Sequence, residues 1–193
     1  MRLSSSQLQA RARRIRLLVF DVDGVLTDGI IWLVPALTAR GREVLLEAKG
    51  FSAHDGIGLA LARHAGLLTG LITRRKSAAV QARAEALGMR FIRQGVINKR
   101  REMHQLLNEA GVDWAETACM GDDIIDLPMM RGCGLMAAPA NARAEVRQAA
   151  HWISPSAGGQ GAARDLIEFI LKARRQWQPA MRAFLEAESG TGN

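Results

Sequence analysis

Short apolar runs alternate along this chain with longer stretches of helical periodicity. The run LLVF at 17–20 is followed at once by an aspartate and a glycine turn, a pattern typical of a strand buried on both faces of a parallel sheet. Further strands are predicted at 67–73, 91–92, 117–120 and 134–137. Helices are predicted at 56–65, 77–87, 99–110, 125–130 and 141–150. The alternation predicts an α/β fold: a doubly wound, mainly parallel sheet with helices on both faces.

The chain length of 193 residues fits a single domain over 1–193. We expect a basic N-terminal helix at 1–15, an α/β core at 16–175 that includes the segment 29–49, and a C-terminal helix with a loose tail at 176–193. Ser4 has the spacing of a capping box that opens the first helix.

The segment 29–49 interrupts the strand and helix rhythm. It contains two β-type stretches around the sequence Ala-Arg-Gly at 39–41, which predicts a projecting β-hairpin. Such a hairpin exposes large apolar side chains unless another subunit covers them, so we expect an oligomer. These side chains are Ile30, Trp32, Val34 and Leu45.

Composition excludes several classes of protein. No apolar run approaches the roughly 18 to 20 residues that a membrane helix needs, and the N-terminal residues lack the apolar block of a secretory signal. We therefore expect no membrane partner and a cytoplasmic location. Cys119 and Cys133 lack the spacing of a zinc site or a disulfide framework, so both are predicted to be reduced core thiols.

The net charge of +7 suits either nucleic acid or small anionic substrates. Single-strand binding also needs aromatic platforms among the basic residues. Tyrosine is absent and aromatic residues make up 5% of the chain, so no nucleic-acid partner is expected and a small anion is favoured.

Six of the nine aspartates fall in two clusters that follow predicted strands. Because parallel strands end at the same edge of a sheet, these carboxylates should converge there and repel one another unless a cation or protonation relieves them. Oxygen ligands without histidine or thiolate favour a magnesium-type ion. Helix and turn capping is the ordinary alternative. The six are Asp21, Asp23, Asp28, Asp122, Asp123 and Asp126.

Two further residues suit a bound phosphate. Thr73 ends an apolar strand, so its hydroxyl could donate to a phosphoryl oxygen at the same edge. Lys99 begins a predicted helix, where its ammonium could neutralise both phosphate and aspartate. Each also has an ordinary reading, as a strand threonine and a solvated lysine.

Four motifs together resemble those of the haloacid dehalogenase-like superfamily of phosphohydrolases: FDVDGVLTDG at 20–29, LIT at 71–73, NK at 98–99 and GDDIID at 121–126. The absence of a cap insertion, the hairpin, FSAHDGIGL and AGGQGAARDL further resemble the 3-deoxy-D-manno-octulosonate 8-phosphate phosphatase family. The resemblance implies a Rossmannoid fold without a cap domain. It also implies a small anionic sugar phosphate as substrate, a place in lipopolysaccharide biosynthesis, magnesium as cofactor, and a homotetramer whose hairpins and tails close neighbouring sites.

Carried over to matching positions, the resemblance makes Asp21 the nucleophile that forms an aspartyl-phosphate. Asp23 would act as the acid that protonates the leaving sugar oxygen and then as the base that activates water. Thr73 and Lys99 complete the catalytic set as contacts for the phosphate.

The resemblance also implies the metal ligands. Magnesium would be held by Asp21, Asp122 and the backbone carbonyl of Asp23, with waters completing an octahedron. Asp123 and Asp126 would support these ligands without binding the metal.

Residues implied in substrate binding surround this set. Arg75 is the candidate for a paired contact with the sugar carboxylate. The alternatives are a solvated helix entry at Arg75 and Lys76, and glycines that only supply turns. The full set is Asp55, Gly56, Arg75, Lys76 and Arg164, with Gly158, Gly159 and Gly161 in the adjoining loop.

Three features depart from the family pattern. Arg74 stands where the family has glycine, Asp165 stands where glutamate is expected, and the hairpin is several residues longer. The substrate could therefore be another acidic sugar phosphate, such as a nine-carbon sialic-acid-type 9-phosphate. A non-catalytic oligomeric binding module of the same fold is the second alternative.

Overall fold

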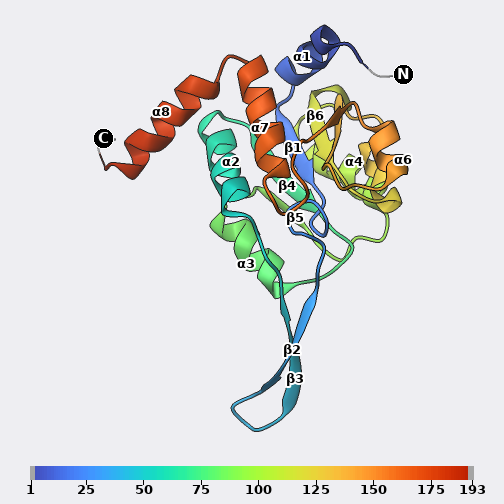
Figure 1. Ribbon diagram of the computed structural model, residues 1–193, viewed down its shortest axis with the longest axis vertical. Helices are drawn as coiled ribbons and strands as arrows, with labels where there is room; N and C mark the ends of the chain where they lie inside the picture. Colours follow the sequence, from blue (N-terminus) through green and yellow to red (C-terminus); the bar gives the residue numbers. More distant parts are fainter. Residues whose placement is uncertain (1–2, 191–193) are drawn as a thin grey trace.

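A parallel sheet flanked by helices forms the body of the protein (Figure 1). In the computed structural model, which describes residues 3–190, this sheet has six strands in the order β5-β4-β1-β6-β7-β8. The predicted fold class is confirmed, and β8 is a strand that the apolar pattern did not reveal. The strands are β1 (Leu17–Phe20), β4 (Leu68–Ile72), β5 (Phe91–Arg93), β6 (Thr117–Met120), β7 (Leu135–Ala138) and β8 (Trp152–Ile153).

Helices cover both faces of the sheet because the central strands are apolar on both faces. Leu18 and Phe20 of β1 belong to one buried cluster, whereas Leu17 and Val19 belong to the other. The first face carries α1 (Ser5–Arg13), α2 (Ala53–His64), α3 (Ala78–Ala86) and α7 (Ala162–Ala173), and α8 (Trp177–Glu188) packs against α2. The second face carries α4 (Lys99–Ala110), α5 (Leu127–Met130) and α6 (Ala144–Ala149).

The strand order places three chain segments next to one another. From the central strand β1 the chain passes to β4 and β5 on one side, then returns to β6 on the other side. Phe20 at the end of β1 is in register with Leu71 of β4 and with Met120 of β6. The loops that follow β1, β4 and β6 therefore emerge side by side, where ligands bind in open α/β sheets.

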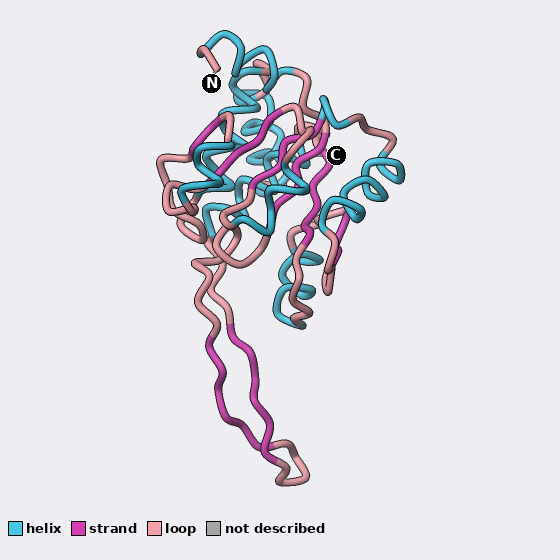
Figure 2. The backbone as a smooth tube through the Cα atoms, turned by 90° about the vertical axis from the view of Figure 1, so that its right-hand side faces the viewer, coloured by secondary structure: helices cyan, strands magenta, loops and turns pink. Residues whose placement is uncertain are grey.

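The predicted hairpin projects far from the body (Figures 1 and 2). Its strands β2 (Trp32–Leu37) and β3 (Glu43–Ala48) pair antiparallel with each other and not with the main sheet. The side chains predicted to be exposed are so, from 47% at Val34 to 64% at Leu45. Leu33 and Leu46 are exposed as well, so both faces of this ribbon present apolar side chains. The described residues contain no separate cap domain.

The chain ends follow the pattern in part. Ser4 accepts a hydrogen bond from the backbone N–H of Gln7 and completes the expected capping box of α1. Of the predicted end segments, residues 1–2 and 191–193 lie outside the described residues, and the division into an end helix, core and tail stays a prediction. Cys119 and Cys133 are both buried free thiols. Within residues 3–190, no helix combines the length and apolar character needed to cross a membrane.

Replacing Leu106 tests the packing of the second face. Leu106 of α4 is fully buried, so Leu106→Ala should lower the free energy of unfolding by about 2–5 kcal/mol through lost burial and a residual cavity. Leu185→Ala is the matched control, because Leu185 of α8 is 62% exposed and should change stability by less than about 0.5 kcal/mol. Urea unfolding measures both, and equal effects would contradict this description of the core.

Candidate active site

Three carboxylates meet at the carboxyl end of the sheet. Asp21 directly follows β1, Asp122 follows β6, and Asp126 ends the short 3-10 helix η2 (Ile124–Asp126). One carboxylate oxygen from each lies within 4.8 Å of the others. The sequence predicted that all six clustered aspartates converge, and the structure brings these three together. Asp28 is exposed, and its Oδ1 accepts a hydrogen bond from the N–H of Ile30 at 2.9 Å.

A buried lysine holds this group together. Lys99 is the first residue of α4, and the helix is opened by Asn98, whose side chain accepts a hydrogen bond from the N–H of Arg101. The Lys99 Nζ lies 2.7 Å from Oδ1 of Asp21 and 2.6 Å from Oδ1 of Asp126. Burial works to lower the pKa of Lys99, but the two carboxylates outweigh it and raise the pKa above its usual value.

Asp126 also shapes the loop that carries Asp122. Its Oδ2 accepts hydrogen bonds from the backbone N–H groups of Asp122 and Asp123, at 3.0 and 3.3 Å. A Cβ at Gly121 would lie 2.4 Å from the Cβ of Asp126, so only glycine fits there. The Asp123 side chain accepts a hydrogen bond from the N–H of Ile124 at 2.6 Å. Asp123 therefore caps the start of η2, which was the alternative to a role at the metal site.

The carboxylates repel one another in the absence of a cation. Burial and the nearby Asp126 raise the pKa of Asp21 to about 6, although Lys99 opposes them. Burial, Asp126 and Asp21 raise the pKa of Asp122 to about 7. A divalent cation would relieve this repulsion, and a donor set made only of oxygen atoms suits magnesium. The residues present therefore fit the predicted metal.

A glycine makes room for the Asp122 carboxylate. Gly24 has a φ of +88°, and a Cβ there would lie 2.2 Å from Oδ2 of Asp122. The loop after β1 thus presents bare backbone to the carboxylate that follows β6. Any side chain at position 24 would displace Asp122 from the group.

Thr73 lies where the sequence placed it, directly after β4. It is buried, its N–H donates to the carbonyl of Arg93, and its own carbonyl accepts from Val96. Its Oγ1 accepts a hydrogen bond from the N–H of Arg75 at 3.4 Å. Arg74 has an ordinary negative φ, since Arg175 is the single non-glycine residue of the described chain with a positive φ.

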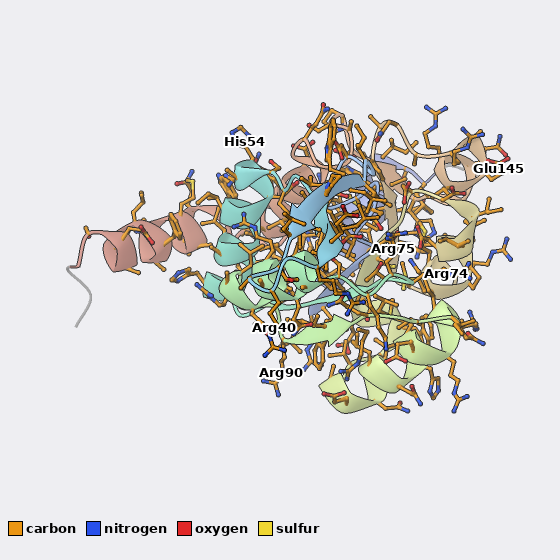
Figure 3. All side chains as sticks on the ribbon, turned by 90° about the horizontal axis from the view of Figure 1, so that it is seen from below. Arg40, His54, Arg74, Arg75, Arg90 and Glu145 are labelled. Carbon is orange, nitrogen blue, oxygen red and sulfur yellow. The ribbon has the colours of Figure 1, made fainter. Side chains whose placement is uncertain are left out.

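Asp23 lies in a network of charged side chains that the sequence pattern did not reveal. Its Oδ1 accepts a hydrogen bond from Nζ of Lys49, and its Oδ2 lies 3.9 Å from Nε of Arg75. Arg75 also pairs with Glu47 at 3.0 Å, and its labelled side chain can be found in the view from the hairpin side (Figure 3). Lys49 and Glu47 belong to the foot of the hairpin. One feature of the sequence could have indicated these contacts. The two ends of a hairpin lie together, so the residues that end it must return close to the loop after β1, where it starts.

Asp55 and Arg164 join α2 to α7, whereas Gly56 of α2 lies against Arg83 of α3. Oδ1 of Asp55 accepts a hydrogen bond from the N–H of Arg164 at 2.8 Å, and burial raises the pKa of Asp55. The Arg164 side chain donates a hydrogen bond to Glu168 at 2.8 Å, and a Cβ at Gly56 would lie 2.8 Å from Nη2 of Arg83. These contacts give the three residues a structural task. Their contact with a substrate stays a prediction.

Lys76 lies against a neighbouring loop. A Cβ at Gly95 would lie 2.5 Å from Cε of Lys76, while the lysine itself is exposed at the entry to α3. This exposed position agrees with a solvated residue at the start of a helix, the alternative to substrate binding. Binding of substrate by Lys76 stays a prediction.

The glycine loop at 158–161 supports the loop after β1. A Cβ at Gly158 would lie 1.8 Å from the carbonyl oxygen of Gly24, and the N–H of Gly159 donates to the carbonyl of Val25 at 2.9 Å. Gly161, with φ +107°, is the N-cap of α7. One turn later Asp165 accepts a hydrogen bond from Ser154 at 2.7 Å. The glycines allow two backbones to touch directly.

Comparisons with known proteins show the family of this chain. Residues 76–166 match the family model of haloacid dehalogenase-like hydrolases. The 3-deoxy-D-manno-octulosonate 8-phosphate phosphatase of Escherichia coli strain K12 is 35% identical over 170 residues, which cover 88% of this chain and 86% of that protein.

Two solved structures are also similar. The phosphatase of that name from Yersinia pestis has a TM-score of 0.80 and 33% identity, with 89% of each chain covered. The one from Moraxella catarrhalis has a TM-score of 0.83 and 32% identity, covers 94% of this chain and 99% of its own, and is a complex with magnesium ion, phosphate ion and a KDO molecule.

The fold and the site thus define a haloacid dehalogenase-like hydrolase, and the chain belongs to that superfamily. Within it the chain belongs to the 3-deoxy-D-manno-octulosonate 8-phosphate phosphatase family, whose members are phosphomonoester hydrolases. The expected cofactor, magnesium, is confirmed by the magnesium complex of a family member and by the acidic group of this chain.

Magnesium affinity should depend on pH. Raised carboxyl pKa values of about 6 and about 7 mean that Asp21 and Asp122 of the metal-free protein hold protons at mildly acidic pH. Protonation of these two carboxyls stabilises the folded protein. This stabilisation is fully present below the pKa that each group has in the unfolded chain, and it is lost as the pH rises through the folded-state values of about 6 and about 7. At higher pH a bound cation would restore it. Affinity should fall at least roughly tenfold between about pH 8 and about pH 5.5, with protons released on binding.

Titration calorimetry in two buffers of different ionisation enthalpy measures both quantities. Asp122→Asn is the control, since it removes one of the two titrating ligands and should weaken both binding and proton release. An affinity that is constant over this pH range would contradict the predicted competition between protons and metal.

Proposed function

We propose that this protein hydrolyses 3-deoxy-D-manno-octulosonate 8-phosphate to the free sugar acid and phosphate, through an aspartyl-phosphate and with magnesium. The observation that carries the proposal is the buried contact of Lys99 with Asp21 beside Asp122, at the carboxyl end of the central strand. The named activity of relatives that match most of the chain supports the choice of substrate. In this proposal the reaction serves lipopolysaccharide biosynthesis in the cytoplasm.

In the first step the Asp21 carboxylate attacks phosphorus. The bond between phosphorus and the sugar oxygen breaks, and Asp23 gives its proton to that oxygen. Lys99 holds Oδ1 of Asp21 and so limits the rotation of the nucleophile. The products of this step are the free sugar acid and an enzyme that carries phosphate on Asp21.

In the second step water attacks the phosphorus of the aspartyl-phosphate. Asp23, now ionised, takes the proton of the water, and the Asp21 carboxylate is regenerated as phosphate leaves. Thr73 donates its hydroxyl to a phosphoryl oxygen, and Lys99 stabilises the charge that develops on the phosphate. The two steps therefore combine the aspartates that follow β1 with Thr73 after β4 and Lys99 at the start of α4.

Magnesium is held in this proposal by Asp21, Asp122 and the backbone carbonyl of Asp23, while Asp126 positions the loop of Asp122. When bound, the ion neutralises phosphate charge and orients the phosphoryl group for in-line attack. Asp123 remains a cap of the adjoining turn and acts on the ligands only through the loop.

Arg75 supplies the paired contact for the sugar carboxylate. It reaches over the loop after β1, where it now pairs with Glu47 and lies near Asp23. A substrate carboxylate would replace Glu47 as its partner. The exposed apolar ribbon at β2 and β3 supports a homotetramer in which neighbouring hairpins cover one another.

Phosphate release tests the reaction. The wild-type protein with magnesium should release phosphate from 3-deoxy-D-manno-octulosonate 8-phosphate faster than from a nine-carbon sialic-acid-type 9-phosphate, and a chelator should stop release. Asp21→Asn should lower turnover roughly 10³-fold or more, because it removes the nucleophile. Preference for the nine-carbon ester would change the substrate, and no release from any phosphomonoester would favour a binding module.

Sedimentation tests the assembly. The wild-type protein should sediment with the mass of four chains, and the double variant Trp32→Asp with Leu33→Asp should form smaller species, because charge would be buried in the contact. Ile97→Asp is the control at a position that is 88% exposed outside the hairpin. A wild-type monomer at micromolar concentration would contradict the tetramer.

A further inference from the structure

Lys49 is a buried lysine that the proposed reaction does not use. It directly follows β3, at the foot of the hairpin, and its side chain has no exposed surface although it carries a charge. A lysine in such a place needs an acidic partner to compensate for lost hydration. The partner is Asp23, whose Oδ1 accepts a hydrogen bond from the Lys49 Nζ.

The surrounding charges keep this contact in one arrangement. Lys49 Nζ lies 4.0 Å from Oε1 of Glu47, and Glu47 pairs through Oε2 with Arg75 at 3.0 Å. Arg75 in turn lies 3.9 Å from Oδ2 of Asp23. The four side chains therefore form a closed ring, in which each basic side chain lies near both acidic ones.

We propose that Lys49 is a positioning residue for proton transfer: it holds Oδ1 of Asp23, so that Oδ2 is the oxygen that gives and takes the proton. The inference rests on the function proposed above for Asp23 and goes beyond it, because it assigns a task to a residue of the hairpin. The same oxygen serves both steps, first donating to the oxygen of the leaving alcohol and then accepting from water.

The physical reason is the freedom of an aspartate side chain. A carboxylate that is held at one oxygen cannot exchange its two oxygens by rotation, so the second keeps one direction. Misplacing a catalytic group by about 1 Å can lower a rate about 10²-fold. Because Lys49 is anchored at the end of a paired strand and shielded from water, it can impose this direction on Asp23.

The leaving group distinguishes positioning from other roles. An alkoxide needs a proton as it departs, whereas para-nitrophenolate departs without one, so only alkyl esters require a well-placed acid. The value of kcat/KM reports the steps up to formation of the phosphoenzyme. We would measure it for aryl and alkyl phosphates without carboxylates, ordered by the basicity of the leaving oxygen, and for the sugar acid phosphate.

Lys49→Met should lower kcat/KM for alkyl phosphates roughly 10- to 100-fold and for para-nitrophenyl phosphate less than about threefold. The second step should also slow, so para-nitrophenol should appear in a burst equal to the enzyme concentration. Lys49→Arg should restore most of the loss, because it keeps a cation for Oδ1. Lys172→Met is the matched control, since Lys172 pairs with Glu168 on the surface of α7.

Three results would overturn the proposal. An equal loss for every leaving group would assign Lys49 a structural role, and a loss confined to the sugar acid phosphate would assign it to recognition of the substrate anion. Unchanged kinetics would remove any role. If circular dichroism shows that Lys49→Met does not fold, the same kcat/KM measurements are made with Lys49→Gln. Activity of the wild-type protein and its loss in Asp21→Asn test the underlying function separately.

Discussion

Mutual repulsion among buried carboxylates is the constraint around which this molecule is organised. Asp21, Asp122 and Asp126 lie close together at the end of the central strands, and burial makes their charges expensive. Lys99 compensates for part of that charge, and it can do so because α4 begins with its side chain directed at the group. What remains uncompensated is a negative site that attracts a divalent cation, and a bound cation would in turn attract a phosphate ester. The cost in stability and the capacity for chemistry thus have the same origin.

Close backbone contacts make this crowding possible. Gly24 leaves room for the Asp122 carboxylate, and Gly121 leaves room for Asp126. Gly158 rests on the carbonyl of Gly24 from the other side, so the loop after β1 is held between two segments distant in sequence. Helix packing on both faces of the sheet holds these segments in place, so the packed core fixes the geometry of the site. The geometry of the carboxylate group therefore depends on positions that carry no reactive group.

The sequence predicted the parts of the site that belong to single strand ends. The apolar run before Asp21 and the one before Asp122 identify buried strands, and parallel strands end at a common edge, so their convergence follows from pattern alone. The network of Asp23 did not follow, because the path of a hairpin back to its origin depends on twist and length that periodicity does not encode. Asp55 and Arg164 show a related limit: their contact joins α2 to α7, and no local signal reports on helix pairing. The two-residue strand β8 is too short for its apolar pattern to stand out.

The regular pairing of the hairpin makes the geometry of its foot independent of the length of its tip. Trp32 faces Ala48 at the foot, and the register continues without interruption to Leu37 and Glu43 near the tip. Residues added in pairs at the tip would lengthen the ribbon and leave every contact at the foot in place, whereas a single added residue within a strand would turn the following side chains to the opposite face. The outer part of the ribbon can thus change in length without moving Lys49 relative to Asp23.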